Sequence, residues 1–182
     1  MDTQWYKYEV FEQERADLPH RHAGSVHAPD GELALENARD VFVRRPNCLS
    51  LWVVPASAVF SRTAAELEQG IELPERDERA APQTFLVFQK QGQVARETFV
   101  AHVGQVEARS PEQALARALD TFPRENVFVW WIVPARAVIR SEASDVPSMF
   151  APAHTKRFRN HLAYPVEPIM RRLKSAEGML DE

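Results

Sequence analysis

The residues best suited to chemistry are three histidines in one short stretch and the single cysteine. His20 and His22 lie two positions apart, so on a β-strand both rings would face the same side and could share a metal ion, with His27 nearby. Arg21 adds unfavourable positive charge, however, and no evident carboxylate completes the ligand set. We therefore expect these histidines to form hydrogen bonds or to lie at an interface. Cys48 has no evident base beside it and is not expected to act as a nucleophile.

Motifs for the common cofactors are absent from the sequence. It contains no glycine-rich phosphate loop, no cysteine pair for zinc or iron–sulfur binding and no G-x-S-x-G nucleophile motif. A di-iron site in a helical bundle needs Glu-x-x-His, and none of the six histidines has a glutamate three residues before it. The sequence therefore predicts no catalytic residue, no cofactor and no metal site in this chain.

The elements that must position these residues occur twice. Residues 22–28 (HAGSVHA) return as HVGQVEA at 102–108, and WVVPA at 52–56 returns as WIVPA at 131–135. The offset falls from 80 to 79 residues between the two blocks, a change that a loop tolerates well. Matching blocks in the same order predict a tandem duplication.

Each copy is predicted to form two strands, a helix and a further strand. Residues 6–11 and 84–88 alternate in the manner of strands. In the next strand of the first copy, alternate residues from His22 to Ala28 fall on one face. Gly24 and its counterpart Gly104 indicate a β-bulge or a close approach of another part of the chain.

A helix follows the second strand in each copy. Ser110, Pro111 and Gln113 have the order of a capping box, and Asp30 occupies the N-cap position in the first copy. Apolar residues then recur at helical spacing in both copies, which predicts one buried face for each helix.

The last strand of each copy, within 49–54 and 127–133, is apolar almost throughout, which is typical of a strand covered on both faces. One helix covers only one face of a small sheet, so the other face requires the second copy or a partner protein. Trp130 and Trp131 are adjacent and therefore point to opposite faces. At least one of these two side chains is expected at an interface with another protein.

Length and composition indicate a globular protein of one or two small domains. The chain has 182 residues, of which 45% are hydrophobic and 26% charged, and its net charge of −4 argues against nucleic-acid binding by the chain as a whole. No apolar run is long enough to span a bilayer, and the N-terminal residues do not resemble a signal peptide. A single cysteine cannot form an internal disulfide. We therefore expect a cytoplasmic protein with no membrane or nucleic-acid partner.

The predicted organisation is module 1 at 1–62, an acidic linker at 63–82, module 2 at 83–142 and a basic, proline-interrupted tail at 143–182. Residues 63–69 are expected to form a short helical turn. The predicted fold is α+β: two tandem ββαβ modules whose antiparallel sheets pack with pseudo-twofold symmetry, followed by an extended C-terminal tail. Basic tails of this kind commonly lie on a partner.

Four sequence blocks in module 1 and one in the tail are distinctive in residue type and spacing. They are LPHRHAGSVHA at 18–28, ALENARD at 34–40, Arg44-Arg45, SLWVVPAS at 50–57, and KRFR at 156–159 with Tyr164. Together they resemble the phenylacetate-degradation B-subunit family (PaaB-type). Members of that family are commonly a single module followed by the tail. The chain therefore resembles a tandem duplication of such a member, with a diverged second module.

The resemblance implies a role in the multicomponent phenylacetyl-CoA 1,2-epoxidase, the monooxygenase of aerobic phenylacetate catabolism. In that complex a separate di-iron catalytic subunit of ferritin-like fold epoxidises the aromatic ring, and a reductase supplies electrons. The B subunit carries no cofactor and organises the catalytic subunits. The expected function is thus that of a non-catalytic bridging subunit. Its expected partners are the di-iron catalytic and companion subunits, with self-association as a further option.

The candidate partner-interface residues are His20, Arg21, His22, His27, Arg44, Arg45, Trp52, Trp130, Trp131, Lys156, Arg157, Phe158, Arg159 and Tyr164. Two alternatives stay open. The first is a stand-alone small-molecule-binding protein or enzyme with a cleft between the modules, in which His22 and His102 would be the candidate residues. The second is a nucleic-acid or acidic-partner binder that uses the basic tail, which predicts a steep salt dependence.

Overall fold

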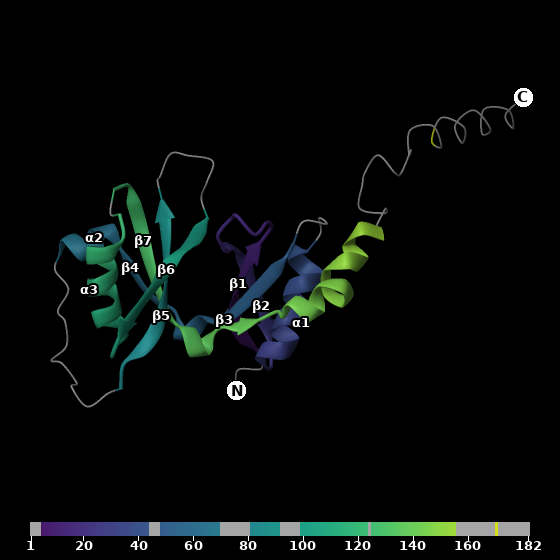
Figure 1. Cartoon of the computed structure of the whole chain (residues 1–182), viewed down its shortest axis with the longest axis horizontal. Coiled ribbons are helices and arrows are strands. Elements are labelled where there is room, and N and C mark those ends of the chain that lie inside the picture. Colours follow the sequence, from purple (N-terminus) through teal and green to yellow (C-terminus); the bar gives the residue numbers. More distant parts are fainter. Residues whose placement is uncertain are drawn as a thin grey trace, which may run out of the picture.

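The structure is a computed structural model of the chain, and it describes residues 5–43, 48–69, 81–91, 99–123, 125–155 and 170. Its strands and longer helices are β1 (Tyr6–Gln13), β2 (Arg21–Ala28), α1 (Gly31–Phe42), β3 (Ser50–Pro55), β4 (Phe60–Thr63), β5 (Gln83–Gln91), β6 (Val100–Ala108), α3 (Pro111–Thr121), β7 (Val127–Pro134) and β8 (Ile139–Arg140) (Figure 1). Short helical turns are η1 (Ala56–Ala58), α2 (Ala64–Glu68), η2 (Ala135–Ala137), η3 (Ala143–Asp145), η4 (Val146–Phe150) and η5 (Ala151–Thr155).

The two long helices begin at the predicted caps. The Asp30 side chain accepts a hydrogen bond from the backbone N–H of Leu33 at 2.8 Å, and Ser110 Oγ accepts one from Gln113 at 3.2 Å. The return bond of the predicted capping box is displaced, because Gln113 Oε1 accepts from the N–H of Arg109, one residue before the N-cap. Each helix buries most of the expected apolar face against its own module, although Val41 of α1 is exposed.

The described strands form one antiparallel sheet with the order β4-β7-β5-β6-β2-β1-β3-β8. The sequence predicts neither β4 nor β8, and each of them pairs with the other module. β4 follows β3 in the chain but pairs with β7, and β8 follows β7 but pairs with β3. The modules therefore exchange their final strands. The sequence predicts a separate sheet for each module, but in the structure the strands of both modules form one continuous sheet.

The sheet bends sharply where β2 meets β6. These two strands pair only at Arg21 and Ala101 in the described residues. Phe11 on β1 and Phe88 on β5 are three strands apart in the order, which would be about 14 Å in a flat sheet. Their ring centroids are nevertheless 4.4 Å apart. The two halves of the sheet therefore face each other, and the short η1 turn suffices to carry the chain from β3 to β4.

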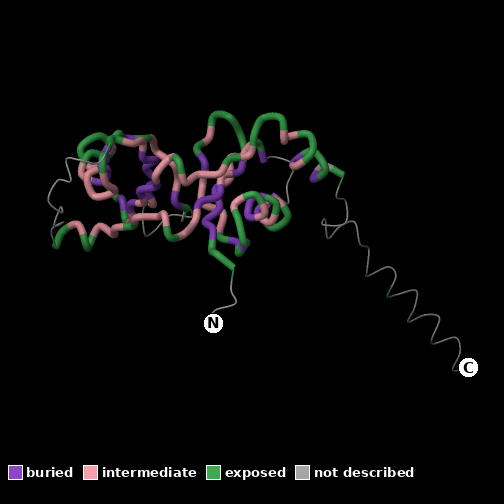
Figure 2. The backbone as a smooth tube through the Cα atoms, turned by 90° about the horizontal axis from the view of Figure 1, so that it is seen from below, coloured by how far each residue is buried: buried purple, intermediate pink, exposed green. Residues whose placement is uncertain are grey.

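Three hydrophobic cores follow from this arrangement. One lies between α1 and the half-sheet of module 1, and another between α3 and the half-sheet of module 2. The third fills the space between the half-sheets and consists of Phe11, Val54, Leu86, Phe88, Val100 and Val133. The buried segments thus lie inside, with the helices outside (Figures 1 and 2). The predicted last strands are covered on both faces along most of their length, on one face by their own helix and on the other by the opposite module, but Leu49 and Phe128 are exposed.

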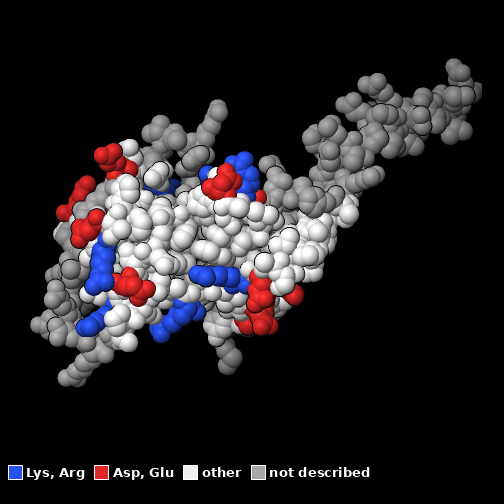
Figure 3. Space-filling model, viewed as in Figure 1, with Lys and Arg blue, Asp and Glu red and all other residues white. Residues whose placement is uncertain are grey.

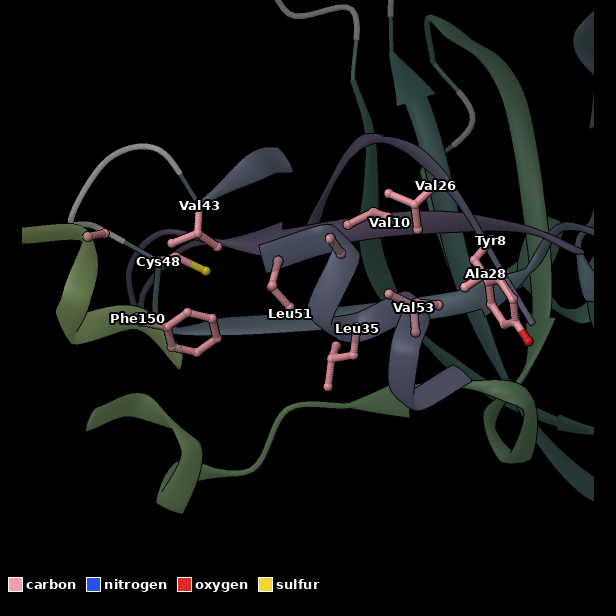
Figure 4. Close-up of a cluster of buried hydrophobic side chains, with 13 residues drawn as sticks. Tyr8, Val10, Val26, Ala28, Leu35, Val43, Cys48, Leu51, Val53 and Phe150 are labelled. Carbon is pink, nitrogen blue, oxygen red and sulfur yellow. The ribbon is translucent and has the colours of Figure 1, made fainter. Parts of the chain in front are cut away.

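The described start of the tail packs on module 1, although it follows module 2 in the chain. Phe150 is 3% exposed and lies in the core of module 1 with Val43 and Cys48 (Figure 4). Ala153 belongs to the same core, and Ile139 of β8 packs against it. This part of the tail therefore completes the fold. Residues 156–169 and 171–182 lie outside the described residues.

Both predicted bulges are present. The strand register shifts opposite Gly24 and opposite Gly104, whose φ angles of 148° and 154° are rarely adopted by other residues. A Cβ atom at either position would also lie 2.7 Å from an aromatic ring, that of Phe42 or Phe122 respectively. At both glycines, therefore, a β-bulge in the strand coincides with close contact between the backbone and an aromatic ring.

The bulge at Gly24 corrects one expectation about β2. His22 pairs with Phe11 and contacts Trp131, so its ring faces the other module. Val26, in contrast, lies in the core beneath α1. The extra residue in the strand reverses the alternation, and His22 does not share a face with Val26.

The predicted linker begins with ordered elements. Thr63 ends β4 and caps α2 in a full capping box: its Oγ1 accepts from the N–H of Glu66 at 3.2 Å, and its own N–H donates to Glu66 Oε2 at 2.7 Å. The predicted helical turn is therefore confirmed. Residues 70–80 lie outside the described residues. Within the described parts of the chain, no helix has the length and apolar character required to cross a bilayer.

Candidate functional site between the two modules

Aromatic and imidazole rings from both modules meet between the two half-sheets. The seam cluster consists of Phe11, His20, His22, Trp52, Phe88, His102 and Trp131. The bend of the sheet brings these rings together, because their strands are far apart in the strand order. The cluster contains four of the predicted interface residues.

Each repeated histidine contacts the repeated tryptophan of the other module. The centroid of the His22 ring lies 5.1 Å from that of Trp131, with the ring planes at 75°. The His102 ring lies 5.3 Å from that of Trp52, at 71°. The same type of edge-on contact is therefore made twice, which gives a structural reason for the recurrence of both residues in the sequence.

Two phenylalanines lie at the centre of the cluster. Phe11 and Phe88 contact each other across the seam at 4.4 Å, and each also lies beside the histidine of its own module, at 5.5 Å from His22 and 5.2 Å from His102. Such aromatic pairs contribute about 0.5–1.5 kcal/mol each beyond the burial of their surface. The seam is therefore a packed core, and the space between the half-sheets is not an open cleft.

Glu9 holds the His22 ring in place. His22 Nε2 lies 2.7 Å from Glu9 Oε2, and Lys7 Nζ lies 2.7 Å from the other carboxylate oxygen. Burial favours the neutral acid, but the hydrogen bonds from His22 and Lys7 outweigh it and lower the pKa of Glu9 below its ordinary value. This carboxylate is not among the residues predicted from the sequence, although alternation along β1 places it on the same face as Phe11.

His102 has no equivalent of that carboxylate. Leu86 occupies the position of β5 that corresponds to Glu9 on β1, since Leu86 pairs with Val133 as Glu9 pairs with Val54. His102 Nε2 is buried, and among the described residues it has no hydrogen-bond partner. Burial lowers the pKa of His102, although a hydrogen bond to the backbone of Gly104 partly opposes this shift.

His20 lies flat on Trp52. The ring centroids are 3.5 Å apart, the planes are inclined by 17°, and His20 Nε2 lies 3.1 Å from Ser50 Oγ. Burial, together with the nearby His102 and Arg140, lowers the pKa of His20 to about 4. His20 is therefore neutral at pH 7. The Arg140 guanidinium lies over the Trp52 ring at 4.8 Å.

His20 and His22 thus form hydrogen bonds and ring contacts within the chain, and their expected role at an interface with a partner stays a prediction. No group of three or more histidine, cysteine, aspartate or glutamate residues in the described parts of the chain is placed to hold a metal ion. Cys48 is 3% exposed, and its thiol donates to the carbonyl of Ser50 at 3.6 Å. Burial, with Glu12 nearby, raises the pKa of Cys48 to about 12, so the nucleophilic thiolate is strongly disfavoured at neutral pH.

The remaining predicted interface residues are dispersed. Arg21 is half-buried at the start of β2, and His27 is exposed farther along the same strand. Trp130 is 2% exposed in the core beneath α3, so its side chain is not accessible to a partner in this structure. Trp131 points to the opposite face, as predicted, where it contacts Phe11 and His22 of module 1, and its expected contact with another protein stays a prediction. The candidates that lie outside the described residues are Arg44, Arg45, Lys156, Arg157, Phe158, Arg159 and Tyr164.

Two hollows flank the junction of β2 and β6. The smaller, of about 120 Å³, is lined by Glu12, Glu14, Leu18, Pro19, Arg21, His22, Ala23 and Phe99. The larger, of about 240 Å³, is lined by Pro19, Arg21, Gln89, Gln91, Phe99, Ala101, His102 and Val103. Both hollows thus combine residues from the two modules at the margin of the seam.

Sequence comparison agrees with the repeated architecture. The family described as Phenylacetic acid degradation B (PaaB) matches residues 4–90 and, a second time, residues 81–169. The chain belongs to this family. The resemblance inferred from the sequence blocks is confirmed, and the two matches support a duplication.

One relative of this PaaB family member is the B subunit of 1,2-phenylacetyl-CoA epoxidase from Escherichia coli (strain K12). It is 48% identical over 62 residues, which are 34% of this chain and 65% of the relative. The chain therefore spans just under two thirds of the length of the curated relative it matches. No solved structure matches the chain.

Proposed function

We propose that the chain is a non-catalytic bridging subunit of a phenylacetyl-CoA epoxidase, which organises separate di-iron catalytic subunits in the cytoplasm. Membership of the PaaB family and the likeness to a protein named as an epoxidase subunit support this proposal. The chain's role is then to hold other polypeptides in position for ring oxygenation in phenylacetate degradation.

The main observation in support of a non-catalytic role is that the potentially reactive side chains are buried or already paired with other groups of the chain. His22 is paired with Glu9, His20 is stacked on Trp52 and neutral, and Cys48 is buried with a strongly raised pKa. A general base needs access to a substrate and a pKa near the working pH, and a nucleophilic cysteine needs an accessible thiolate. His20 and His22 instead lie at the contact between the modules, and Cys48 lies in the core of module 1.

We also propose that the two modules pack with pseudo-twofold symmetry, as a fused form of a dimer of single modules. The reciprocal contacts of His22 with Trp131 and of His102 with Trp52 support this view, as does the reciprocal exchange of β4 and β8. A covalent link between the halves makes their association independent of protein concentration.

The surface charge also favours a protein partner. On the face shown in Figure 3, the described acidic and basic residues are interspersed, without a broad region of one sign. On that face, the described residues form no continuous basic surface of the kind that binds nucleic acid through its phosphates.

Co-expression with the epoxidase catalytic subunit from the organism that encodes the chain tests the proposal. We expect the two proteins to co-purify and to elute together at a fixed stoichiometry in gel filtration. If the chain elutes alone while the other epoxidase subunits associate normally with each other, the bridging role is wrong.

A second candidate function is the binding of a small molecule beside His102. The larger hollow lies next to this residue, whose Nε2 has no partner in the described residues, and Arg21 also lines it. Its volume of about 240 Å³ is below the roughly 300–1,000 Å³ of typical ligand pockets, which disfavours this alternative. The alternative requires that His102→Ala abolish ligand binding or activity while the protein remains folded.

A further inference from the structure

The two segments that the modules exchange occupy equivalent places in the fold. Donor segment 1 consists of residues 60–68, which form β4 and α2, and donor segment 2 consists of residues 139–155, from β8 to η5. Phe60 pairs with β7 and Ile139 pairs with β3, each opposite the residue that follows the repeated tryptophan of that strand. Each donor segment therefore adds a strand to the other module in the same register.

Each donor segment also completes the core of the other module. Thr63 and Glu142 donate their backbone N–H to the carboxylate of the residue three positions later, in both cases at 2.7 Å. Leu67 follows the first of these turns and packs against the core of module 2, and Val146 follows the second and packs against the core of module 1. Neither core is therefore complete without the donor segment of the other half.

The chain passes from one module to the other at η1 and returns at η2. Residues 70–80 follow α2, which packs against the core of module 2, and precede β5, which belongs to the same module (Figure 1). A cut within residues 70–80 would therefore leave donor segment 1 on an N-terminal half, residues 1–69, and donor segment 2 on a C-terminal half, residues 81–182.

Donor segment 2 fits closely against the start of α1. A Cβ atom placed on Gly31, the first residue of α1, would lie 1.9 Å from Cδ1 of Ile139. Module 2 has Pro111 as the first residue of α3, and donor segment 1 has Phe60 at the position that corresponds to Ile139. The contact between isoleucine and glycine is thus specific to one of the two exchanges, because a phenylalanine brings a larger side chain of different shape to the same place.

Polar contacts along β3 distinguish the donor segments as well. Ser141 Oγ accepts a hydrogen bond from the N–H of Leu51, and the Ser141 N–H donates to the Leu51 carbonyl, both at 2.9 Å. The corresponding residue of donor segment 1 is Arg62, whose side chain has no acceptor. The Arg140 guanidinium lies over the Trp52 ring at 4.8 Å, whereas donor segment 1 has a serine at the corresponding position.

We propose that the two halves of the chain are a matched pair. The N-terminal half binds donor segment 2 of the C-terminal half in preference to donor segment 1 of a second N-terminal half, and the halves hold together without the link through residues 70–80. A pair of two N-terminal halves would place Phe60 against Gly31 and would lose the acceptor that Ser141 provides. This inference does not depend on a role in the epoxidase.

Cleavage of the folded full chain tests whether the link is needed. A protease recognition sequence inserted within residues 70–80 allows the purified chain to be cut after it has folded. We expect the two halves to elute together in gel filtration at the volume of the intact chain, because the seam core and both exchanged strands remain. Elution of separate halves would overturn the proposal.

Refolding of the cut chain from urea tests the preference between like and unlike halves. Native mass spectrometry identifies each pair by its mass. We expect pairs of unlike halves to exceed pairs of two N-terminal halves by about tenfold or more, because only the unlike pair has the close fit and the polar contacts of donor segment 2. A distribution that matches random pairing would overturn the preference.

Gly31→Ala in the cut chain tests the close fit directly. Alanine is a better helix former than glycine, so the substitution by itself does not weaken α1. We expect the dissociation constant of the two halves to rise by about tenfold or more, because the added Cβ would meet Cδ1 of Ile139. Ile139→Val removes that atom and should bring the dissociation constant of the Gly31→Ala chain to within about threefold of the unmodified value. Glu36→Ala, at an exposed position of α1, is the control and should change it by less than about twofold.

The valine variant separates a local clash from a general loss of structure. Weaker pairing in Gly31→Ala that Ile139→Val restores supports the matched pair. An unchanged dissociation constant in Gly31→Ala, or a loss that Ile139→Val does not relieve, would overturn it. Neither result affects the bridging function, which co-expression with the catalytic subunit tests separately.

Discussion

Replacing Phe11 with alanine tests whether the two modules fold as one unit. Phe11 is 0% exposed, its ring lies 4.4 Å from that of Phe88, and it also contacts Trp131 at 6.2 Å. Truncation of a fully buried phenylalanine costs about 3–5 kcal/mol, through lost apolar contact and the cavity that remains. The loss is large against the roughly 5–15 kcal/mol that stabilises a typical domain.

The appropriate assay is urea unfolding followed by both tryptophan fluorescence and far-UV circular dichroism. Trp52 and Trp131 report on the seam, and circular dichroism reports on both modules. We expect one shared transition that moves to lower urea with an unchanged slope, because both half-sheets lose the same core. Phe99→Ala is the matched control: its ring is 50% exposed, and the change should cost about 0.5 kcal/mol or less. A cost below about 1 kcal/mol for Phe11→Ala, or a separate transition in which module 2 is unaffected, would refute the reasoning.

Three further predictions concern the histidines, one bulge and the cysteine. Burial lowers the pKa of His20 from 6.5 to about 4, so between these pH values the unfolded chain binds more protons than the folded chain. The free energy of unfolding should therefore be highest above pH 6.5 and should decrease as the pH falls towards 4. The decrease should be smaller in His20→Gln. Urea titrations across this range test it, and higher stability in acid would contradict it. Gly104→Ala should lower the free energy of unfolding by about 1–3 kcal/mol, because the added Cβ would contact the Phe122 ring and the φ angle at this position is strained for alanine. An unchanged melting temperature would contradict this prediction. Cys48 should react with a thiol reagent at pH 8 only when the protein unfolds, so rapid labelling of the native chain would disprove its burial.

Local signals in the sequence account for most elements within each module. Side chains such as Asp30 and Ser110 satisfy helix N–H groups within one turn, so their effect depends on neighbours in the chain. The bulges at Gly24 and Gly104 are likewise local, because both positions require a backbone conformation that favours glycine. The repeated blocks then predict two similar units.

The exchanged strands could not be predicted in the same way. β4 and β8 span only Phe60–Thr63 and Ile139–Arg140, too few residues to show a hydrophobic period. Each is held by a strand of the other module, so the stabilising partner lies far away in the chain. The face of His22 was mispredicted for a related reason, since the bulge adds one residue to the alternation.

The candidate site was predicted in part. Repetition singled out His22, Trp52 and Trp131, and the structure brings these residues together at the seam between the modules, while their role at a partner interface stays a prediction. Glu9 and Phe88 were missed, because their importance depends on a bend that brings distant strands face to face. An ordinary strand alternation gives no sign of such long-range contacts.

The most direct test of a bridging rather than catalytic role is the turnover of phenylacetyl-CoA by the reconstituted complex. The chain for this test carries His22→Gln and His102→Gln together, so that both rings at the seam are replaced. We expect a less stable chain, but turnover per assembled complex within about twofold of the unmodified complex, because neither ring takes part in proton transfer. A fall of about a hundredfold or more in complexes that assemble normally would contradict the proposal, since removal of a general acid or base has an effect of that size.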